Sequence, residues 1–204
     1  MKLKECAIIT PGVFTNRVET SPHSENSVHV KVLTLKEFNQ CLGVDYRISQ
    51  EKDNSLFVNK EKVKPEVVTD DKSLVLHIQT QKFVWFPSHY AGLLLTNNFL
   101  KLTFTQDVDL HFMEWLLNEH PTIQKQIALF TEGSVAAVLK LSNVKEIEVD
   151  VPALSTQTTL GKVAQLKKRK AALLRQKEQL EQEWLHHKMV AALTNEGGHR
   201  YVNK

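Results

Sequence analysis

The chain has 204 residues, of which 42% are hydrophobic and 24% are charged, so it is long enough to bury one or two hydrophobic cores. No run of about 18 apolar residues occurs, which argues against a membrane-spanning helix. Near the start, Glu5 interrupts the short apolar stretch, so we expect no secretory signal. Cys6 and Cys41 are the only cysteines and lie in no metal-binding spacing, which favours reduced thiols in a cytoplasmic protein.

The positive charge of the chain is unevenly distributed. The formal net charge of +3 is too small to indicate a nucleic-acid partner by itself. Between Thr158 and Val190, however, eight Lys or Arg residues stand against three Glu residues, and the difference gives this one segment a net charge of +5. Such a concentration indicates an anionic partner, although the solvated face of a coiled coil has a similar composition.

Residues 1–152 have the mixed texture of a sheet-rich domain. Segments rich in β-branched, aromatic or long apolar residues predict strands at 28–33, 46–48, 56–58, 73–78, 83–86 and within 93–104, with a helical turn at 35–40. Four or more strands before the first long helical pattern favour a curled, mostly antiparallel sheet over a doubly wound one. The expected fold class is therefore α+β.

Two small helices are expected after these strands. Asp107 or Asp109 can cap the first helix, and its apolar face has helical spacing: Leu110, Met113, Leu116 and Leu117. Pro121 suits the first position of the second helix, because proline lacks the backbone N–H that is unused there. The alternation of residues 147–151 then predicts one more strand, which Pro152 ends.

The last element is a long helix. Residues 153–157 read as a linker, residues 158–194 contain no proline and predict a helix of roughly 50 Å, and residues 195–204 form a tail. A helix this long cannot bury its apolar stripe against so small a domain. Leucines recur every seven residues at one core position of a heptad, and a second core position adds Val163 and Trp184 but also Lys170 and Lys177. The residues predicted to form a dimer or partner interface are Val163, Leu166, Leu173, Leu180 and Trp184.

The two lysines in this seam affect how the helix can pair. They weaken a tight parallel zipper, whereas an antiparallel pairing, or a pairing with the surface of a third protein, tolerates them better. The sequence therefore predicts an antiparallel coiled coil or a pairing with the surface of a third protein.

No motif for catalysis occurs in the chain. HExxH, GxSxG, P-loop and GxGxxG patterns are absent from the sequence. The adjacent His186 and His187 point in different directions on a helix, and turn or cap roles account for Asp70, Asp71 and Asp109. We therefore expect no enzyme activity and no metal site.

Several short motifs occur in the order found in one protein family. Residues 2–12 follow the pattern K-L-G-D-I-x-x-I-x-x-G, with Lys4 in place of the usual glycine, and residues 97–102 fit N-x-x-L-x-x-L in part. Residues 72–76 match a G-D-I-L-I pattern loosely, without its Gly-Asp. Residues 133–157 give a Gly-Ser pair, a strand, one proline where the family has two, and a Gln before the heptad helix. This order resembles the target recognition domain in the specificity subunit of type I restriction-modification systems.

The resemblance implies a role in choosing DNA sequences. Specificity subunits generally contain two recognition domains, each followed by one long helix, and the two helices pack antiparallel as a spacer. The single domain and helix here would be a half-subunit that pairs with itself or with a sibling subunit. The implied partners are double-stranded DNA, methyltransferase subunits and possibly a restriction subunit. Because the methyltransferase subunits of this family hold S-adenosylmethionine, the resemblance implies that this chain needs no cofactor.

Base readout requires side chains that form paired hydrogen bonds, such as Arg with guanine and Asn or Gln with adenine. The candidates outside the expected core are Asn16, Arg17, Arg47, Gln79, Gln81, Lys82, His89 and Tyr90. Ser134, with the amides beside Gly133, is a candidate for binding a phosphate. For each residue, ordinary surface exposure is the competing interpretation. Two other functions stay open: a coiled-coil adaptor whose globular domain binds protein, and a stand-alone dimeric DNA-binding regulator.

Overall fold

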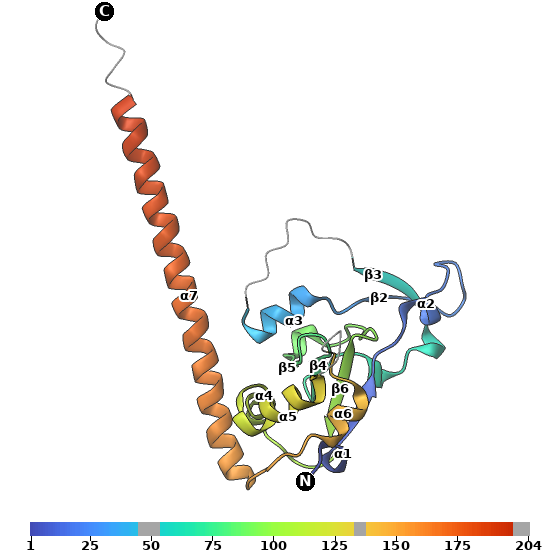
Figure 1. Cartoon of the computed structure of the whole chain (residues 1–204). Helices are drawn as coiled ribbons and strands as arrows, with labels where there is room; N and C mark the ends of the chain where they lie inside the picture. Colours follow the sequence, from blue (N-terminus) through green and yellow to red (C-terminus); the bar gives the residue numbers. More distant parts are fainter. Residues whose placement is uncertain (45–53, 133–137, 198–204) are drawn as a thin grey trace, which may run out of the picture. The chain divides into compact units, whose positions relative to one another are not determined.

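A four-stranded antiparallel sheet organises the first half of the chain (Figure 1). A computed structural model describes residues 1–44, 54–132 and 138–197, with side chains as far as residue 193. The contacts divide the chain into two units, Met1–Ala164 and Gln165–Lys204. The strands of the sheet are, in spatial order, β1 (Ala7–Pro11), β6 (Phe99–Phe104), β4 (Ser73–His77) and β5 (Lys82–Trp85). A separate antiparallel ribbon pairs β2 (Ser27–Lys31) with β3 (Ser55–Asn59).

Strand β4 lies inside the sheet and is buried along its whole length. Because side chains alternate between the faces of a strand, Leu74 and Leu76 enter one hydrophobic cluster while Val75 enters another. The neighbouring strands divide in the same way, since Phe83 joins the first cluster and Val84 the second. The sheet is therefore covered on both faces.

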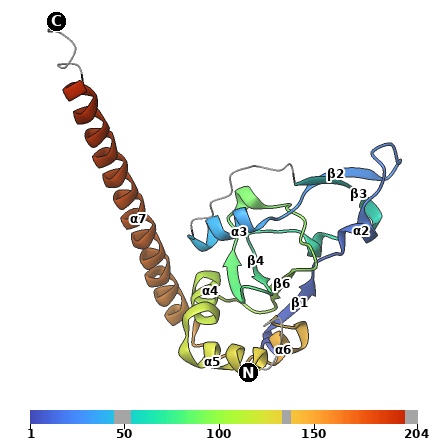
Figure 2. The same ribbon diagram turned by 45° about the horizontal axis from the view of Figure 1, so that its top comes forward.

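Helices cover the two faces of the sheet (Figure 2). Four helices contribute to the first cluster: α1 (Leu3–Cys6), α4 (Leu110–Glu119), α5 (Pro121–Thr131) and α6 (Leu141–Glu146). On the other face, α3 (Leu35–Leu42) inserts Phe38, and Thr34 caps its first turn by accepting from the Lys36 N–H. A third cluster lies under the β2–β3 ribbon and includes Val18 at the end of α2 (Thr15–Val18). Among the described residues of this unit there are also three single-turn 3-10 helices: η1 (Lys60–Lys62), η2 (Pro65–Val67) and η3 (Ser88–Tyr90).

The predicted α+β fold class is confirmed, including the mostly antiparallel sheet, the small helices and the long C-terminal helix. Asp109 caps α4, with its carboxylate accepting from the Phe112 N–H at 2.8 Å, and Pro121 begins α5. The strand expected at 46–48 lies outside the described residues.

The prediction of a strand at 147–151 is wrong. Its alternation does bury Ile147 and Val149, but its backbone bonds to the first residues of the chain and to the side-chain amide of Gln126, and not to a strand. The Leu3 N–H donates to the Ile147 carbonyl at 2.9 Å, and the Val149 N–H donates to the Met1 carbonyl at 2.8 Å. Because these partners belong to a loop and to the short helix α1, only an isolated bridge between Lys2 and Glu148 forms, and no strand.

The long helix α7 (Leu154–Gly197) begins four residues before the predicted start at residue 158. Residues 154–157, predicted as linker, form its first turn, in which the Gln157 N–H donates to the Ala153 carbonyl at 3.1 Å. Pro152 lies just outside the helix and does not interrupt it. The boundary between the two compact units therefore falls within α7, between Ala164 and Gln165.

Gly12 closes the opening motif because no side chain fits there. A Cβ atom at Gly12 would lie 2.1 Å from the Thr96 carbonyl oxygen and 2.6 Å from that of Leu95. We expect Gly12→Ala to lower the free energy of unfolding by about 1–3 kcal/mol, since rigid backbone must move. Urea denaturation measures this. Gly92→Ala is the control: Gly92 has open space around it and only a positive φ of 90°, so its cost should be nearer 1 kcal/mol. Equal, small losses for both variants would contradict the packing argument.

Candidate DNA interface and root of the long helix

The turn between β4 and β5 presents three of the predicted DNA-contacting residues. Gln79 is exposed, and Gln81 and Lys82 are half-buried. The Gln81 N–H donates to the His77 carbonyl at 2.9 Å, which closes the turn. Gln81 has a φ of 57°, a left-handed conformation that costs a residue with a Cβ about 1 kcal/mol. The fold therefore maintains a strained residue at an accessible turn.

His77 holds this turn against the core. Its ring is buried, with centroids 5.7 Å from Phe38 and 5.0 Å from Phe99. Burial lowers the pKa of His77, and its Nδ1 accepts from the Thr80 N–H at 3.3 Å. The imidazole is therefore neutral at physiological pH, and the turn rests on a rigid support.

A second group of predicted residues lies on helix α2. Asn16 and Arg17 are both exposed, and the Arg17 guanidinium lies 4.7 Å from the centroid of the Phe14 ring. The Lys62 ammonium donates to the Arg17 carbonyl at 3.3 Å. These contacts orient two cations and an aromatic ring on one surface, a combination suited to phosphates and bases.

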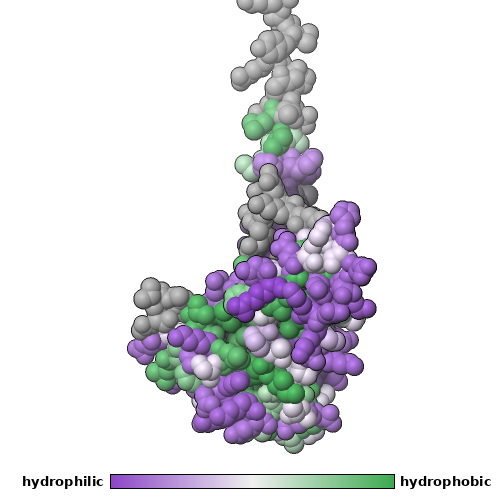
Figure 3. Space-filling model, turned by 90° about the vertical axis from the view of Figure 1, so that its right-hand side faces the viewer, coloured by the Kyte–Doolittle hydropathy of each residue, from purple (hydrophilic) through white to green (hydrophobic). Residues whose placement is uncertain are grey.

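The adjacent ribbon adds residues that sequence reasoning missed. The rings of His29 on β2 and Phe57 on β3 lie 4.8 Å apart, and Phe57 and Phe14 are 37% and 48% exposed. Hydrophobic and polar residues are mixed on the face of the globular unit that Figure 3 presents. In the sequence, the aromatic Phe57 lies close to Lys60 and Lys62, and this pattern could have indicated the ribbon as a candidate DNA-contacting surface.

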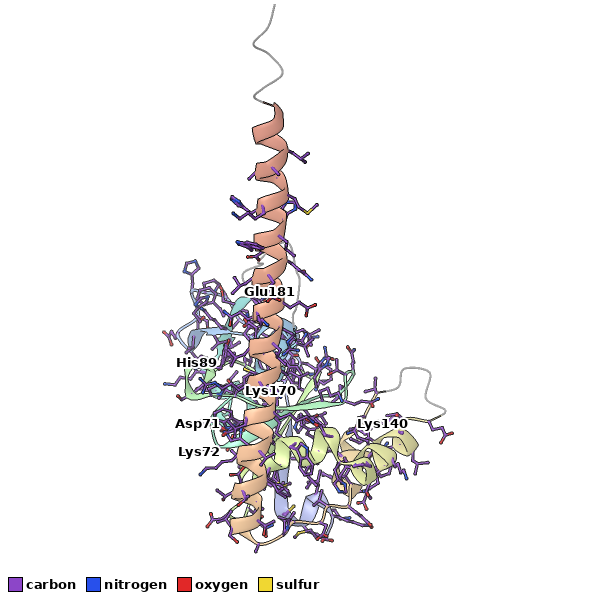
Figure 4. The ribbon with its side chains drawn as sticks, turned by 90° about the vertical axis from the view of Figure 1, so that its left-hand side faces the viewer. Asp71, Lys72, His89, Lys140, Lys170 and Glu181 are labelled. Atoms are coloured by element: carbon purple, nitrogen blue, oxygen red, sulfur yellow. The ribbon has the colours of Figure 1, made fainter. Side chains whose placement is uncertain are left out.

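The third group lies on η3. His89 is exposed and stacks beside Tyr90 with 4.3 Å between ring centroids, while the Tyr90 hydroxyl lies 3.1 Å from Gln40 Oε1, to which it donates. Burial raises the pKa of Tyr90, so the hydroxyl keeps its proton at neutral pH. Asp71 and Lys72 lie near His89 at this end of the β4–β5 hairpin (Figure 4).

An ion pair joins β6 to the segment before β4, next to Thr69, whose hydroxyl donates to the Tyr90 carbonyl of η3 at 2.5 Å. The Lys101 ammonium is 4% exposed, lies 2.6 Å from Asp70, and donates to the Val68 carbonyl at 2.8 Å. Burial alone would raise the pKa of Asp70, but hydrogen bonds from Lys101, Ser73 and the Lys72 N–H outweigh it and lower that pKa. The buried ammonium therefore has a carboxylate and a carbonyl as partners, which offset the free-energy cost of removing its charge from water.

The predicted DNA contacts therefore occupy three separate places. Because β4 and β5 run antiparallel, their turn lies at the opposite end of the hairpin from η3, and α2 lies beside the ribbon. Predicted residues that are neighbours in the sequence lie together, but the three groups do not form one pocket. Arg47 and Ser134 lie outside the described residues.

The first turns of α7 are fastened to the globular unit by Gln157. Its side chain is 3% exposed, its Oε1 accepts from the Asp109 N–H at 3.0 Å, and its Nε2 donates to the Pro152 carbonyl at 2.8 Å. One turn later, a Cβ atom at Gly161 would lie 2.2 Å from Asp109 Oδ1. The family-like Gln therefore anchors the helix to the start of α4, and Gly161 permits the close approach.

Beyond this root, the predicted seam of α7 is exposed. The side chains of Val163, Leu166, Leu173, Leu180 and Trp184 are 55% to 66% exposed. The same helix face carries two adjoining shallow grooves, which share Leu173 and Lys177. So much exposed apolar surface on one helix indicates a face that binds a partner.

Two findings concern other kinds of site. Within the described ranges, no helix combines the length and apolarity that crossing a membrane requires. The same residues contain no group of three or more His, Cys, Asp or Glu placed to hold a metal ion.

The fold is similar to solved structures of type I restriction-modification systems. No protein-family model matches the sequence, and neither does any curated protein. A chain from a study of complex assembly and conformational transition of the type I R-M system superposes with a TM-score of 0.62 and 13% identity over 95% of this chain. The type I S subunit from M. genitalium gives 0.52 and 12% over 91%. The protein thus has the fold of a type I specificity subunit, and it spans about half the length of these structures, 48% and 44%.

We expect substitutions at the root of α7 to reveal its anchoring. Gln157→Ala leaves the Asp109 N–H and the Pro152 carbonyl without partners and should lower the free energy of unfolding by about 1–3 kcal/mol. Gly161→Ala would stabilise an isolated helix by about 1 kcal/mol, but here it should destabilise, because the new methyl group meets Asp109. Urea denaturation measures both, with the exposed Gln165→Ala as the control. A stabilising Gly161→Ala would refute the close approach.

Proposed function

We propose that this protein is a DNA-sequence-recognition subunit of a type I-like restriction-modification system. The main support is the similarity to a solved type I chain, which covers 95% of this chain but only 48% of the solved chain. That proportion corresponds to one recognition domain followed by one long helix. In this proposal the globular unit reads one DNA half-site, and α7 joins it to a second copy or to a sibling subunit.

The candidate side chains have the chemistry that base readout requires. Amides such as those of Gln79 and Gln81 pair with adenine in the major groove, and a guanidinium such as that of Arg17 pairs with guanine. Lys82 suits a phosphate. His77 beneath the turn supports this role, because a reading side chain needs a rigid base to discriminate between sequences.

The remaining parts of the proposal concern partners. Methyltransferase subunits, in some systems joined by a restriction subunit, would act on the DNA in the cytoplasm and hold S-adenosylmethionine. This chain would position them without catalysing a step or binding a cofactor. If two identical copies pair, two-fold symmetry gives a palindromic site with two separated halves.

The methylation pattern of the source cell tests the proposal directly. Deleting the gene should abolish methylation at a two-part motif with a fixed gap, because no other subunit directs the methyltransferase there. Sequencing that detects methylated bases, with and without the gene, gives the result. Palindromic halves indicate self-pairing, and unlike halves indicate a sibling subunit. An unchanged pattern in cells that express the protein would reject the role and favour an adaptor or a stand-alone regulator.

Binding to that motif tests the β4–β5 turn. Gln79→Ala and Gln81→Gly should each weaken binding by about 1–3 kcal/mol if the amides pair with bases. Gln81→Gly should leave the melting temperature unchanged or higher, since glycine adopts a φ of 57° without strain. Lys82→Gln should reduce the salt slope of binding by about one.

Fluorescence anisotropy at several salt concentrations measures these effects, with the exposed Gln106→Ala as a control. Full affinity in all three turn variants would remove the turn from the interface. Weak binding with no salt dependence would favour the coiled-coil adaptor, because phosphate contacts make binding decline steeply with salt.

A further inference from the structure

The charges beside the exposed seam of α7 select one way for the helix to pair with itself. We propose that two copies of α7 pair antiparallel in a single register, with the two-fold axis level with Arg175. This inference rests on the proposed self-pairing of the subunit and adds its register.

In an antiparallel pair, the heptad position that holds the leucines in one copy lies opposite the position that holds Lys170, Lys177 and Trp184 in the second copy. Leu166 of one copy faces Trp184 of the second, Leu173 faces Lys177, and Leu180 faces Lys170. These side chains are the exposed ones that line the two grooves on the helix. The pairing would remove the leucines and Trp184 from water, which is its main driving force.

The seam lysines argue against a parallel pair. In a parallel, in-register pair, Lys170 would face Lys170 and Lys177 would face Lys177 at the core, where like charges repel with little solvent screening. In the antiparallel register each lysine lies opposite a leucine. Its aliphatic stem covers the leucine while its ammonium reaches solvent at the edge of the pair.

The residues that flank the seam are complementary in charge in this register. Arg169 lies opposite Glu183 of the second copy, and Lys167 lies opposite Glu181. Two-fold symmetry repeats both contacts, so two kinds of ion pair give four. The present contacts of the two glutamates lie within α7, at exposed positions: Lys177 is 3.5 Å from Glu181, and Gln179 donates to Glu183 at 2.8 Å. Figure 4 labels Lys170 and Glu181 on the helix.

Sliding one helix by a heptad removes most of this complementarity. In one direction Glu183 meets Lys162, but Lys167 then faces Leu174. In the other direction Lys167 faces Lys188 and Arg169 faces Val190, so a repulsion replaces the attractions. A slide of two heptads brings Arg169 against Arg169, or Glu183 against Glu183. Flanking charges of this kind set orientation and partner in coiled coils.

Cysteine cross-linking of the full chain tests the register. All variants carry Cys41→Ala, so that the buried Cys6 is the one native thiol left. Gln176 lies beside the axis and faces its own copy, so Gln176→Cys should give a covalent dimer with a short bismaleimide. Arg169→Cys and Glu183→Cys should each give none alone and a covalent dimer when mixed. Self-linking of either single variant, or no linking by Gln176→Cys, would overturn the register.

A charge exchange provides the second test. Glu181→Lys with Glu183→Lys places four repulsions in the pair, and Lys167→Glu with Arg169→Glu does the same. Each double variant should dissociate at least about tenfold more readily than the unaltered chain, measured by sedimentation. Mixed together they should form a heterodimer, because every reversed charge then meets its opposite. Unchanged self-association of both double variants would overturn the proposal.

The two proposals can fail separately. A dimer that directs methylation but does not cross-link at Gln176 keeps the proposed function and rejects this register. If the chain cross-links as this register predicts but its deletion leaves methylation unchanged, the register is supported and the proposed function is rejected. A chain that remains monomeric in sedimentation at high micromolar concentration rejects self-pairing in any register.

Discussion

The side chain of one buried amide determines how this fold can use its long helix. Gln157 satisfies the Asp109 N–H with its oxygen and the Pro152 carbonyl with its nitrogen, so neither polar group is left unpaired where α7 begins. Because both ends of the amide are used, rotation of the side chain would break two hydrogen bonds at once. Gly161 lets the next turn approach Asp109 closely. Together these contacts fasten the first turns of α7 to the start of α4.

The globular unit follows the same rule of paired polar groups at its interior. Lys101 is neutralised by Asp70, and neutral His77 accepts from the turn that it supports. The first contact joins β6 to the segment before β4, and the second joins β4 to the β4–β5 turn, which carries candidate DNA contacts. These interior polar contacts therefore hold surface segments in fixed positions against a well-packed sheet. Selective recognition requires surface side chains that are held in this way.

The elements that local patterns specify were predictable, and the long-range partners were not. The β-branched run at β4, the Asp109 cap and Pro121 of α5 each reveal their role within a few residues of sequence. The alternation at 147–151 gave the correct buried side chains but not a strand, because its backbone partners are about 145 residues away. The strand order β1-β6-β4-β5 likewise leaves no local signal, so sequence could nominate DNA-contacting residues but not show that they lie in three separate places.

The lysines in the seam of α7 illustrate why an interface can gain from weaker packing. A seam of leucine alone would bury more apolar surface, but it would accept many registers and many partners with similar affinity. Replacing two core positions with lysine gives up part of that affinity and makes a parallel pairing repulsive, while the flanking charges separate the antiparallel registers. Under the proposed function, register would matter more than tightness, because it would set the gap between the two DNA half-sites. A sibling chain that replaced the second copy would have to present acidic residues opposite Lys167 and Arg169, so the charges would define the set of exchangeable partners.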